Sequence, residues 1–279
     1  MQRLITVALA LLLPAGGCLL QTRRPMSFRP KPPEGYVWLL NDGLSDEFDE
    51  PKLDGKKWFP LHPYWGGRLP SQFISDNVTM DHGHLILRST ARPRIETDGV
   101  AKIGGISVNA ACLSSAEASA SYGYYEARFR ASRLSMSSSF WMQGKYSEID
   151  IAEQMGAPLK SPEEAYYLHA NTHFFKDSWK NDKNTRIKWR MPRGAADVDH
   201  TYGAWWKDED TVWFYCDGKE VAKIKTGGKF LEPMYLFFDT EVFVDAGLPT
   251  DKSLKDALSN GMSVGWVRAW KLVRKAQAR

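Results

Sequence analysis

From Tyr36 onward the sequence consists of short apolar runs that Gly, Asp, Asn and Pro interrupt at intervals of about ten residues, the spacing typical of an all-β sandwich. Two of these runs, residues 122–130 (YGYYEARFR) and 211–215 (TVWFY), alternate with the period of two that a half-buried strand requires. Helical spacing of apolar side chains is clearest in residues 251–259. A chain of 279 residues without internal repeats is therefore expected to form one large β domain.

The N-terminal residues have the layout of an export signal. A charged start is followed by an apolar run over residues 4–13, which is too short to remain as a membrane-spanning helix. Small residues then lead to Cys18, as in a bacterial lipobox, whose cysteine is lipidated, although Ala15 stands where that motif usually has a larger aliphatic residue. We expect an exported protein with a signal peptide over residues 1–18 and a lipid anchor on Cys18 at the bacterial cell envelope. The alternative is a plain secretory signal that is cut nearby.

Residues 19–35 are polar and rich in proline and arginine, so we expect a linker between this anchor and a folded domain over residues 36–275. Lys and Arg number 37 against 33 Asp and Glu, with no basic block, so a nucleic-acid partner is not expected. Besides Cys18, the chain contains Cys112 and Cys216. An exported protein permits a disulfide between them, but both lie in apolar, strand-like sequence, so two buried thiols are an equal alternative.

Three carboxylates lie close together in residues 148–153 (EIDIAE). In a regular strand Glu148 and Asp150 point to one face and Glu153 points to the other. A one-residue bulge at residues 151–152 would bring Glu153 to the face of the other two. Apolar residues precede and interleave these acids, and acids inside an apolar stretch are costly unless they have a function. A strand with solvated acids on one face is the alternative.

Hydrolysis of a glycosidic bond with retention of configuration needs two carboxyl groups about 5–5.5 Å apart, one ionised and one protonated. A third acid between them can hold a proton by hydrogen bonding and move the neighbouring pKa values apart. We therefore assign Glu148 as the nucleophile, Glu153 as the acid/base and Asp150 as the residue that tunes their pKa values.

The surrounding sequence resembles the family 16 glycoside hydrolases, bacterial enzymes that cut within chains of β-linked glucans and galactans. The resemblance covers most of the expected domain, in residues 44–49 (LSDEFD), 83–88 (GHLILR), 122–128 (YGYYEAR), 202–206 (YGAWW) and 264–271 (VGWVRAWK). It implies a β-jelly-roll sandwich of two antiparallel sheets, with an open substrate cleft on the concave face. The same roles for Glu148, Asp150 and Glu153 follow from it, because these positions match the family residue by residue.

Two residues separate Asp150 from Glu153, whereas the lichenase-like branch of the family has one. Residues 65–71 (WGGRLPS), 135–141 (SMSSSFW) and 238–242 (FDTEV) resemble β-agarases and β-porphyranases. This resemblance implies endo-hydrolysis of β-1,4 linkages in a red-algal galactan of the agarose or porphyran type, and it leaves open whether sulfate is recognised. The alternatives are a laminarinase-like hydrolase of β-1,3-glucan and a carbohydrate-binding lipoprotein without catalytic activity.

Besides the three acids, the residues expected to contact the polysaccharide are Trp65, Arg68, Arg133, Trp141, His173 and Glu241. In the Gly-rich stretch around residue 66, an indole could stack on a sugar and a guanidinium could bind hydroxyl or sulfate groups. Trp141 is expected to form the floor under the sugar at the cleavage site, with plain core packing as the alternative. His173 shares a strand face with His169, whose role stays open, and a zinc-hydrolase pattern does not accompany the pair.

Catalysis by carboxyl groups needs no cofactor, and we assign no metal site. Members of the family often carry a structural Ca²⁺ ion, and Asp46, Glu47 and Asp49 are acidic candidates for ligands. A dedicated calcium-binding loop does not accompany them. The oligomeric state is not predicted.

Overall fold

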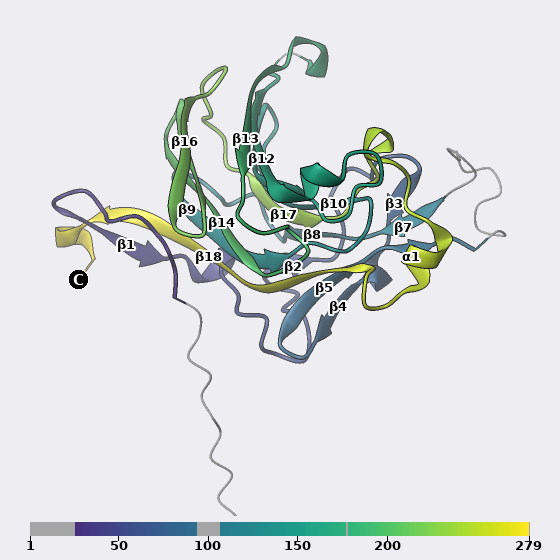
Figure 1. Cartoon of the computed structure of the whole chain (residues 1–279). Helices are drawn as coiled ribbons and strands as arrows, with labels where there is room; N and C mark the ends of the chain where they lie inside the picture. The colour runs from purple at the N-terminus through teal and green to yellow at the C-terminus, as the bar shows by residue number, and fades with distance from the viewer. Residues whose placement is uncertain (1–25, 94–106, 177, 279) are drawn as a thin grey trace, which may run out of the picture.

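The computed structural model describes residues 26–93, 107–176 and 178–278. Two large antiparallel sheets pack face to face, which confirms the predicted all-β jelly-roll sandwich (Figure 1). The eight-stranded sheet has the order β16 (Lys219–Lys225), β15 (Thr211–Cys216), β14 (His200–Asp208), β9 (Gly123–Arg130), β18 (Gly261–Arg274), β5 (His84–Arg88) and β4 (Val78–Asp81), with β1 (Tyr36–Leu40) also paired to β18.

The seven-stranded sheet contains the acidic strand near its middle. Its order is β13 (Lys183–Arg190), β12 (Tyr167–Phe174), β11 (Ser147–Met155), β10 (Ser137–Gln143), β17 (Tyr235–Asp239), β8 (Cys112–Ser115) and β2 (Trp58–Phe59). A small third sheet joins β3 (Ser71–Phe73), β7 (Val108–Ala110) and β6 (Thr90–Ala91). The short 3₁₀ helices are η1 (Asp42–Leu44), η2 (Ser75–Asn77), η4 (Pro162–Tyr166), η5 (Trp179–Asn181), η6 (Val244–Ala246) and η7 (Lys275–Gln277).

The main hydrophobic core lies between the two large sheets. Phe140 and Ile149 enter it from the seven-stranded sheet, and Tyr202 and Phe214 enter it from the eight-stranded sheet. Complete burial of a large apolar side chain stabilises a fold by roughly 1.5–3 kcal/mol, so this layer holds the two sheets together. Because one face of the seven-stranded sheet is taken up by the core, its other face is available for a site.

Turns and the helix follow from local sequence. The hairpin between β15 and β16 turns at Asp217 and Gly218, whose φ angles are +49° and +79°, as an Asp-Gly hairpin turn requires. Helix α1 (Asp251–Lys255) begins with a capping box between Thr250 and Ser253. It is shorter than predicted because the side chain of Asp256 accepts hydrogen bonds from the two residues at positions 258 and 259, which forms a turn instead of a further helical turn.

Residues 26–33, at the end of the expected linker, lie against the eight-stranded sheet. The backbone N–H of Phe28 donates to Glu126 Oε2 over 3.2 Å, and Trp38 Nε1 donates to the carbonyl oxygen of Pro30 over 2.8 Å. The whole expected signal peptide with Cys18, and the first part of the expected linker through residue 25, lie outside the described residues. Within the described residues, no helix is long and apolar enough to cross a membrane.

Candidate active site

The acidic strand β11 contains the predicted bulge. Its register with β12 pairs Asp150 with Asn171 and then Glu153 with His169, so two residues of β11 stand opposite one residue of β12. The two residues of the bulge, Ile151 and Ala152, are both fully buried in the core between the sheets. The side chains of Glu148, Asp150 and Glu153 therefore share the opposite face of the strand, where all three line one cleft.

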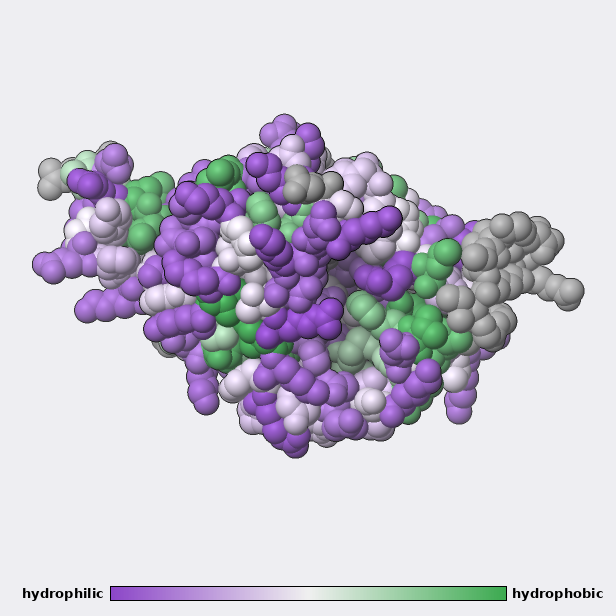
Figure 2. Space-filling model, turned by 90° about the horizontal axis from the view of Figure 1, so that it is seen from above, coloured by the Kyte–Doolittle hydropathy of each residue, from purple (hydrophilic) through white to green (hydrophobic). Residues whose placement is uncertain are grey.

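The cleft has a volume of about 950 Å³ and lies over the seven-stranded sheet. The face in Figure 2 is hollowed near its centre, where hydrophilic and hydrophobic residues meet. Five of the six predicted substrate-binding residues line this cleft together with the acids: Trp65, Arg68, Trp141, His173 and Glu241. The structure thus brings these five residues, which lie far apart in the sequence, to one cleft with the three acids.

The acids of the cleft are strongly coupled through burial and mutual repulsion. Burial, followed by the charges of Asp150 and Glu241, raises the pKa of Glu153 from 4.5 to about 8. Burial, Asp150 and Glu153 also raise the pKa of Glu148, while the amide Nε2 of Gln143 donates to Glu148 Oε2 over 2.5 Å and opposes this rise. Carboxyl groups this close to one another cannot all ionise at neutral pH, so some of them hold protons.

Trp141 belongs to both the core and the cleft. Its ring stacks on Phe237 with 4.3 Å between centroids, and its Nε1 donates to Asp239 Oδ2 over 3.1 Å. His62 stacks on Phe237 at 4.5 Å and on Trp141 at 5.7 Å between centroids, and burial lowers the pKa of His62 from 6.5 to about 4, so this ring is neutral. Its Nδ1 accepts from the backbone N–H of Trp65 over 3.1 Å, which fixes the loop that carries Trp65.

Arg68 and Glu241, both predicted to contact substrate, also bind each other. Arg68 Nε donates to Glu241 Oε2 over 2.5 Å, and the guanidinium lies 4.6 Å from the centre of the Phe243 ring. The side chain of Arg68 is 49% exposed, and its terminal N–H groups make no hydrogen bond in the described part of the chain. Arg68 is therefore oriented by Glu241 while part of its guanidinium still faces the cleft.

The opposite wall of the cleft contains residues that the sequence did not single out. The ring of Trp179 is 53% exposed, lines the cleft and stacks on Phe175 with 3.7 Å between centroids. Asp182 Oδ2 lies 2.6 Å from His173 Nδ1. Arg186 faces the cleft from β13, where the register places it opposite Asn171. All three residues follow β12 in the chain, and the sequence alone does not indicate that this segment lies beside the acids.

Comparison with known proteins assigns this architecture to a family. The sequence model described as "Beta-porphyranase A-D, GH16 domain" matches residues 38–272. The chain belongs to this family of glycoside hydrolases. Beta-porphyranase B of Phocaeicola plebeius is 32% identical to the enzyme over 283 residues, which cover 88% of each protein. Beta-porphyranase E of Zobellia galactanivorans is 32% identical over 260 residues, which cover 86% of the enzyme and 90% of the relative.

Solved structures agree with this assignment. The crystal structure of a beta-porphyranase from the human gut bacterium Bacteroides plebeius superposes with a TM-score of 0.79 and 31% identity, over 89% of the enzyme and 96% of that chain. The structure of beta-agarase A in complex with oligoagarose superposes with a TM-score of 0.76 at 19% identity, over 88% of the enzyme and 96% of that chain, and this likeness concerns the fold alone. The predicted family, fold and glycoside hydrolase class are thereby confirmed.

The structure does not bring Arg133 to the cleft. Its backbone N–H donates to the carbonyl oxygen of Ser259, and its guanidinium lies 3.7 Å from Asp197 with 55% of the side chain exposed. The expectation of substrate contact rested on closeness to the acidic strand in the sequence. It fails because the loop after β9 directs this side chain to Asp197 instead.

Two of the three candidate calcium ligands, Asp46 and Glu47, accept hydrogen bonds from other residues of the protein. Asp46 accepts from Trp58 Nε1 over 2.8 Å and from the backbone N–H of Phe48 over 2.9 Å. Glu47 accepts from Arg268 through both carboxylate oxygens, over 2.7 and 2.9 Å. These contacts give Asp46 and Glu47 partners within the fold.

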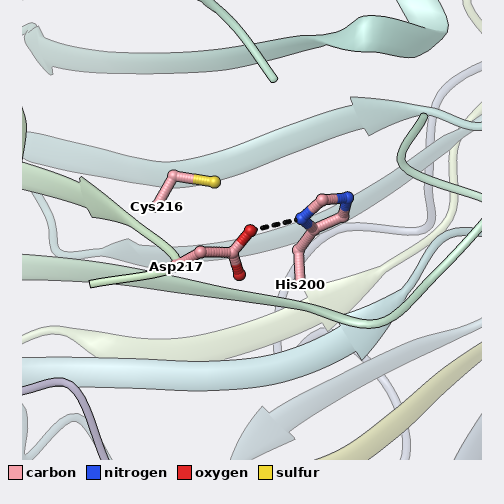
Figure 3. Close-up of side chains that lie close together, drawn as sticks. All are labelled: His200, Cys216 and Asp217. Atoms are coloured by element: carbon pink, nitrogen blue, oxygen red, sulfur yellow. Dashed lines mark hydrogen bonds and ion pairs between the residues drawn. The ribbon is translucent and has the colours of Figure 1, made fainter. Parts of the chain in front are cut away.

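His200, Cys216 and Asp217 form a group whose metal-ligating atoms all lie within 4.8 Å of one another (Figure 3). His200 Nδ1 and Asp217 Oδ2 are 2.6 Å apart, which is a hydrogen bond. Cys216 and Cys112 are both buried free thiols, and burial raises the pKa of the Cys216 thiol. Asp217 also accepts from the backbone N–H of Thr201 over 2.8 Å, so we interpret this group as a tie between β14 and the turn that follows β15.

Proposed function

We propose that the enzyme cleaves β-1,4 linkages within chains of a red-algal galactan, with retention of configuration and with porphyran as its preferred substrate. The family model and the two relatives named above carry the name porphyranase, which supports this substrate class. The observation that carries the reaction is the bulge in β11, because it turns three carboxyl groups toward one cleft.

Glu148 is the proposed nucleophile and Glu153 the proposed acid/base. Burial and the neighbouring acids raise the pKa of Glu148, and the hydrogen bond that it accepts from Gln143 acts in the opposite direction and favours its ionised form. Among the described residues no donor reaches Glu153, and its pKa of about 8 keeps it protonated at neutral pH, as a general acid requires. Asp150, which lies between the two glutamates on the strand, raises both of their pKa values through its charge.

The reaction then follows the two steps of a retaining hydrolase. Glu148 attacks the anomeric carbon while Glu153 gives its proton to the leaving oxygen, which yields a glycosyl-enzyme ester. Glu153, now ionised, removes a proton from water, and this water attacks the anomeric carbon and releases Glu148. Trp141 under the acids and the exposed ring of Trp179 are the proposed apolar platforms for the sugar rings.

Two arginines on opposite sides of the acids support a sulfated galactan. Arg68 offers its terminal N–H groups on one side. On the other side, Arg186 is exposed, lines the cleft and has no ion pair or hydrogen bond with any residue that the structure describes. Since Asp150 pairs with Asn171 and Asn171 with Arg186, the arginine lies two strands, or about 10 Å, from Asp150. That distance suits a substituent on a neighbouring sugar unit.

Release of reducing ends from porphyran, desulfated porphyran, agarose, κ-carrageenan and laminarin tests this proposal. We expect a higher kcat/KM on porphyran than on its desulfated form. Arg186→Ala should lower kcat/KM on porphyran about tenfold, the value of one charge-assisted hydrogen bond, and leave the rate on agarose unchanged. Arg190→Ala is a matched control, because Arg190 lies on the same strand over Tyr166 and does not line the cleft. Equal rates on the two forms of porphyran would refute the sulfate preference, and activity on laminarin alone would refute the galactanase assignment.

A second candidate is an enzyme whose main substrate is agarose. The beta-agarase AgaB34 of Agarivorans albus is 27% identical to the enzyme over 274 residues, which cover 85% of the enzyme and 57% of that protein. This candidate predicts the opposite order of rates in the same assay.

A further inference from the structure

His173 lies between two carboxylates, one from the acidic strand and one from the opposite wall of the cleft. We propose that Asp182 is a positioning residue for catalysis, which holds the imidazole of His173 against the acids in its charged form. This inference rests on the catalytic roles proposed above for Glu148, Asp150 and Glu153. It assigns a function to a residue that does not itself reach the sugar.

The geometry around the imidazole is closely defined. His173 Nδ1 lies 2.6 Å from Asp182 Oδ2, and His173 Nε2 lies 3.3 Å from Asp150 Oδ2 and 4.0 Å from Glu148 Oε1. The side chains of His173 and Asp182 are only 15% and 14% exposed, so solvent screens the contact weakly. Asn184 Nδ2 donates to Asp182 Oδ2 over 3.0 Å and orients the carboxylate from β13.

Two alternative hydrogen-bond patterns are available to the ring. A neutral imidazole donates through one nitrogen only, so with Nδ1 donating to Asp182 the Nε2 atom would accept from the amide of Asn171, which lies 2.8 Å away. A charged imidazole donates through both nitrogens, to Asp182 and to Asp150, and this pattern needs the amide of Asn171 to turn its oxygen instead of its nitrogen toward Nε2. Burial lowers the pKa of His173, but hydrogen bonds and charge from Asp150 and Asp182 outweigh it and raise the pKa from 6.5 to about 9.

A protonated His173 acts on the carboxyl groups that surround it. Glu148 and Asp150 face the imidazole of His173 from β11, and Asp182 faces it from the segment before β13. Arg186 lies on β13, two residues beyond the residue that pairs with His173, and so on the same face of the sheet. The charge of His173 lowers the pKa of Glu153, against the larger effects that raise it. A charged His173 therefore offsets part of the repulsion among the acids and favours an ionised Glu148. Asp182 maintains this charge from the far side of the ring.

Asp182→Asn separates charge from geometry, because the amide keeps the size of the side chain and an oxygen that can accept from Nδ1. The six histidines of the chain can be followed by NMR with isotope-labelled histidine, and the signal of His173 is assigned by its absence in His173→Gln. We expect His173 to titrate near pH 9 in the wild type and at least about two pH units lower in Asp182→Asn. A wild-type value at or below about 6.5, the ordinary value for histidine, would overturn the proposal even if the variant did not fold.

The pH dependence of kcat/KM on the galactan is the second readout. We expect Asp182→Asn to lose about tenfold or more at pH 8, where its His173 is neutral, and to recover to within about twofold of the wild type at pH 6, where His173 is charged in both proteins. An equal loss at every pH would show a merely structural role and overturn the proposal. Asp197→Asn, which changes the surface contact with Arg133, is the control and should leave the profile unchanged.

The titration requires no substrate, so the two hypotheses can fail separately. If Glu148→Gln is inactive but the pKa of His173 does not change in Asp182→Asn, the inference about Asp182 is wrong and the catalytic roles stand. If the pKa changes as expected but Glu148→Gln retains turnover, the catalytic roles are wrong, and with them the positioning role of Asp182.

Discussion

Replacing Glu153 by Gln should make the folded enzyme more stable near neutral pH while it abolishes turnover. The pKa of Glu153 is raised in the folded state, mainly by burial, from 4.5 to about 8. A group with a raised pKa contributes stability that is fully present below 4.5 and is lost as the pH rises toward 8. Each pH unit in this window costs about 1.4 kcal/mol, so the upper limit of the loss at pH 7 is about 3 kcal/mol. Because the cleft is open and the neighbouring acids share protons, we expect Glu153→Gln to be more stable by about 1–3 kcal/mol at pH 7.

Guanidinium unfolding of the wild type and the variant between pH 4.5 and pH 8 measures this difference. The free energy of unfolding of Glu153→Gln should exceed that of the wild type by a growing amount as the pH rises. Glu164→Gln is a control of opposite sign, because hydrogen bonds from Lys188 and His169 outweigh burial and lower the pKa of Glu164. That variant should be less stable than the wild type above the unfolded pKa of 4.5, and the difference should close as the pH falls. A stability difference between Glu153→Gln and the wild type that does not grow with pH would refute the electrostatic account of the site.

Three further predictions concern activity. Glu148→Gln should lower kcat by about 10³-fold or more with an unchanged circular dichroism spectrum, and near wild-type turnover would refute its role as nucleophile. Trp179→Ala should raise KM about tenfold with little change in kcat, because an exposed ring on the cleft wall binds the sugar equally in the ground and transition states. Arg133→Ala should keep kcat/KM within about twofold of the wild type. A larger loss for Arg133→Ala would mean that the loop after β9 reaches the substrate.

Local features of the sequence were sufficient to predict the all-β class and the acidic strand, whereas the jelly-roll sandwich was implied by the resemblance to the family 16 glycoside hydrolases. Alternating runs and the turn at Asp217 and Gly218 depend on residues near each other in the chain, and the structure contains the expected strands and a left-handed turn there. The bulge in β11 was predictable from the chemistry of the acids, because a regular strand would turn Glu153 away from Glu148 and Asp150, and a carboxyl group among apolar residues is costly. Five of the six predicted substrate-binding residues line the cleft, because each lies on or beside a strand with a definite face or in the loop that contains Trp65 and Arg68.

The rest of the site depends on contacts between segments far apart in the chain. Asp182 and Trp179 come from a stretch of short 3₁₀ structure, where side-chain direction does not follow a period. His62 reads as an isolated histidine in sequence, and its role in supporting the loop of Trp65 appears only once Phe237 is stacked on it. Arg133 was expected in the cleft but does not line it, because closeness to the acids in the sequence does not determine where a loop side chain points.

The central claim is that Glu148 attacks the sugar and Glu153 transfers the proton, and azide rescue tests it most directly. Glu148→Ala and Glu153→Ala would each be given an aryl glycoside of a galactan oligosaccharide and sodium azide, and the glycosyl azide products would be identified by NMR. In Glu148→Ala, azide takes the place of the missing nucleophile and should yield the α-glycosyl azide. In Glu153→Ala, azide attacks the ester on Glu148 and should yield the β-glycosyl azide. The reverse pair of products, or an α-azide from neither variant, would contradict the account.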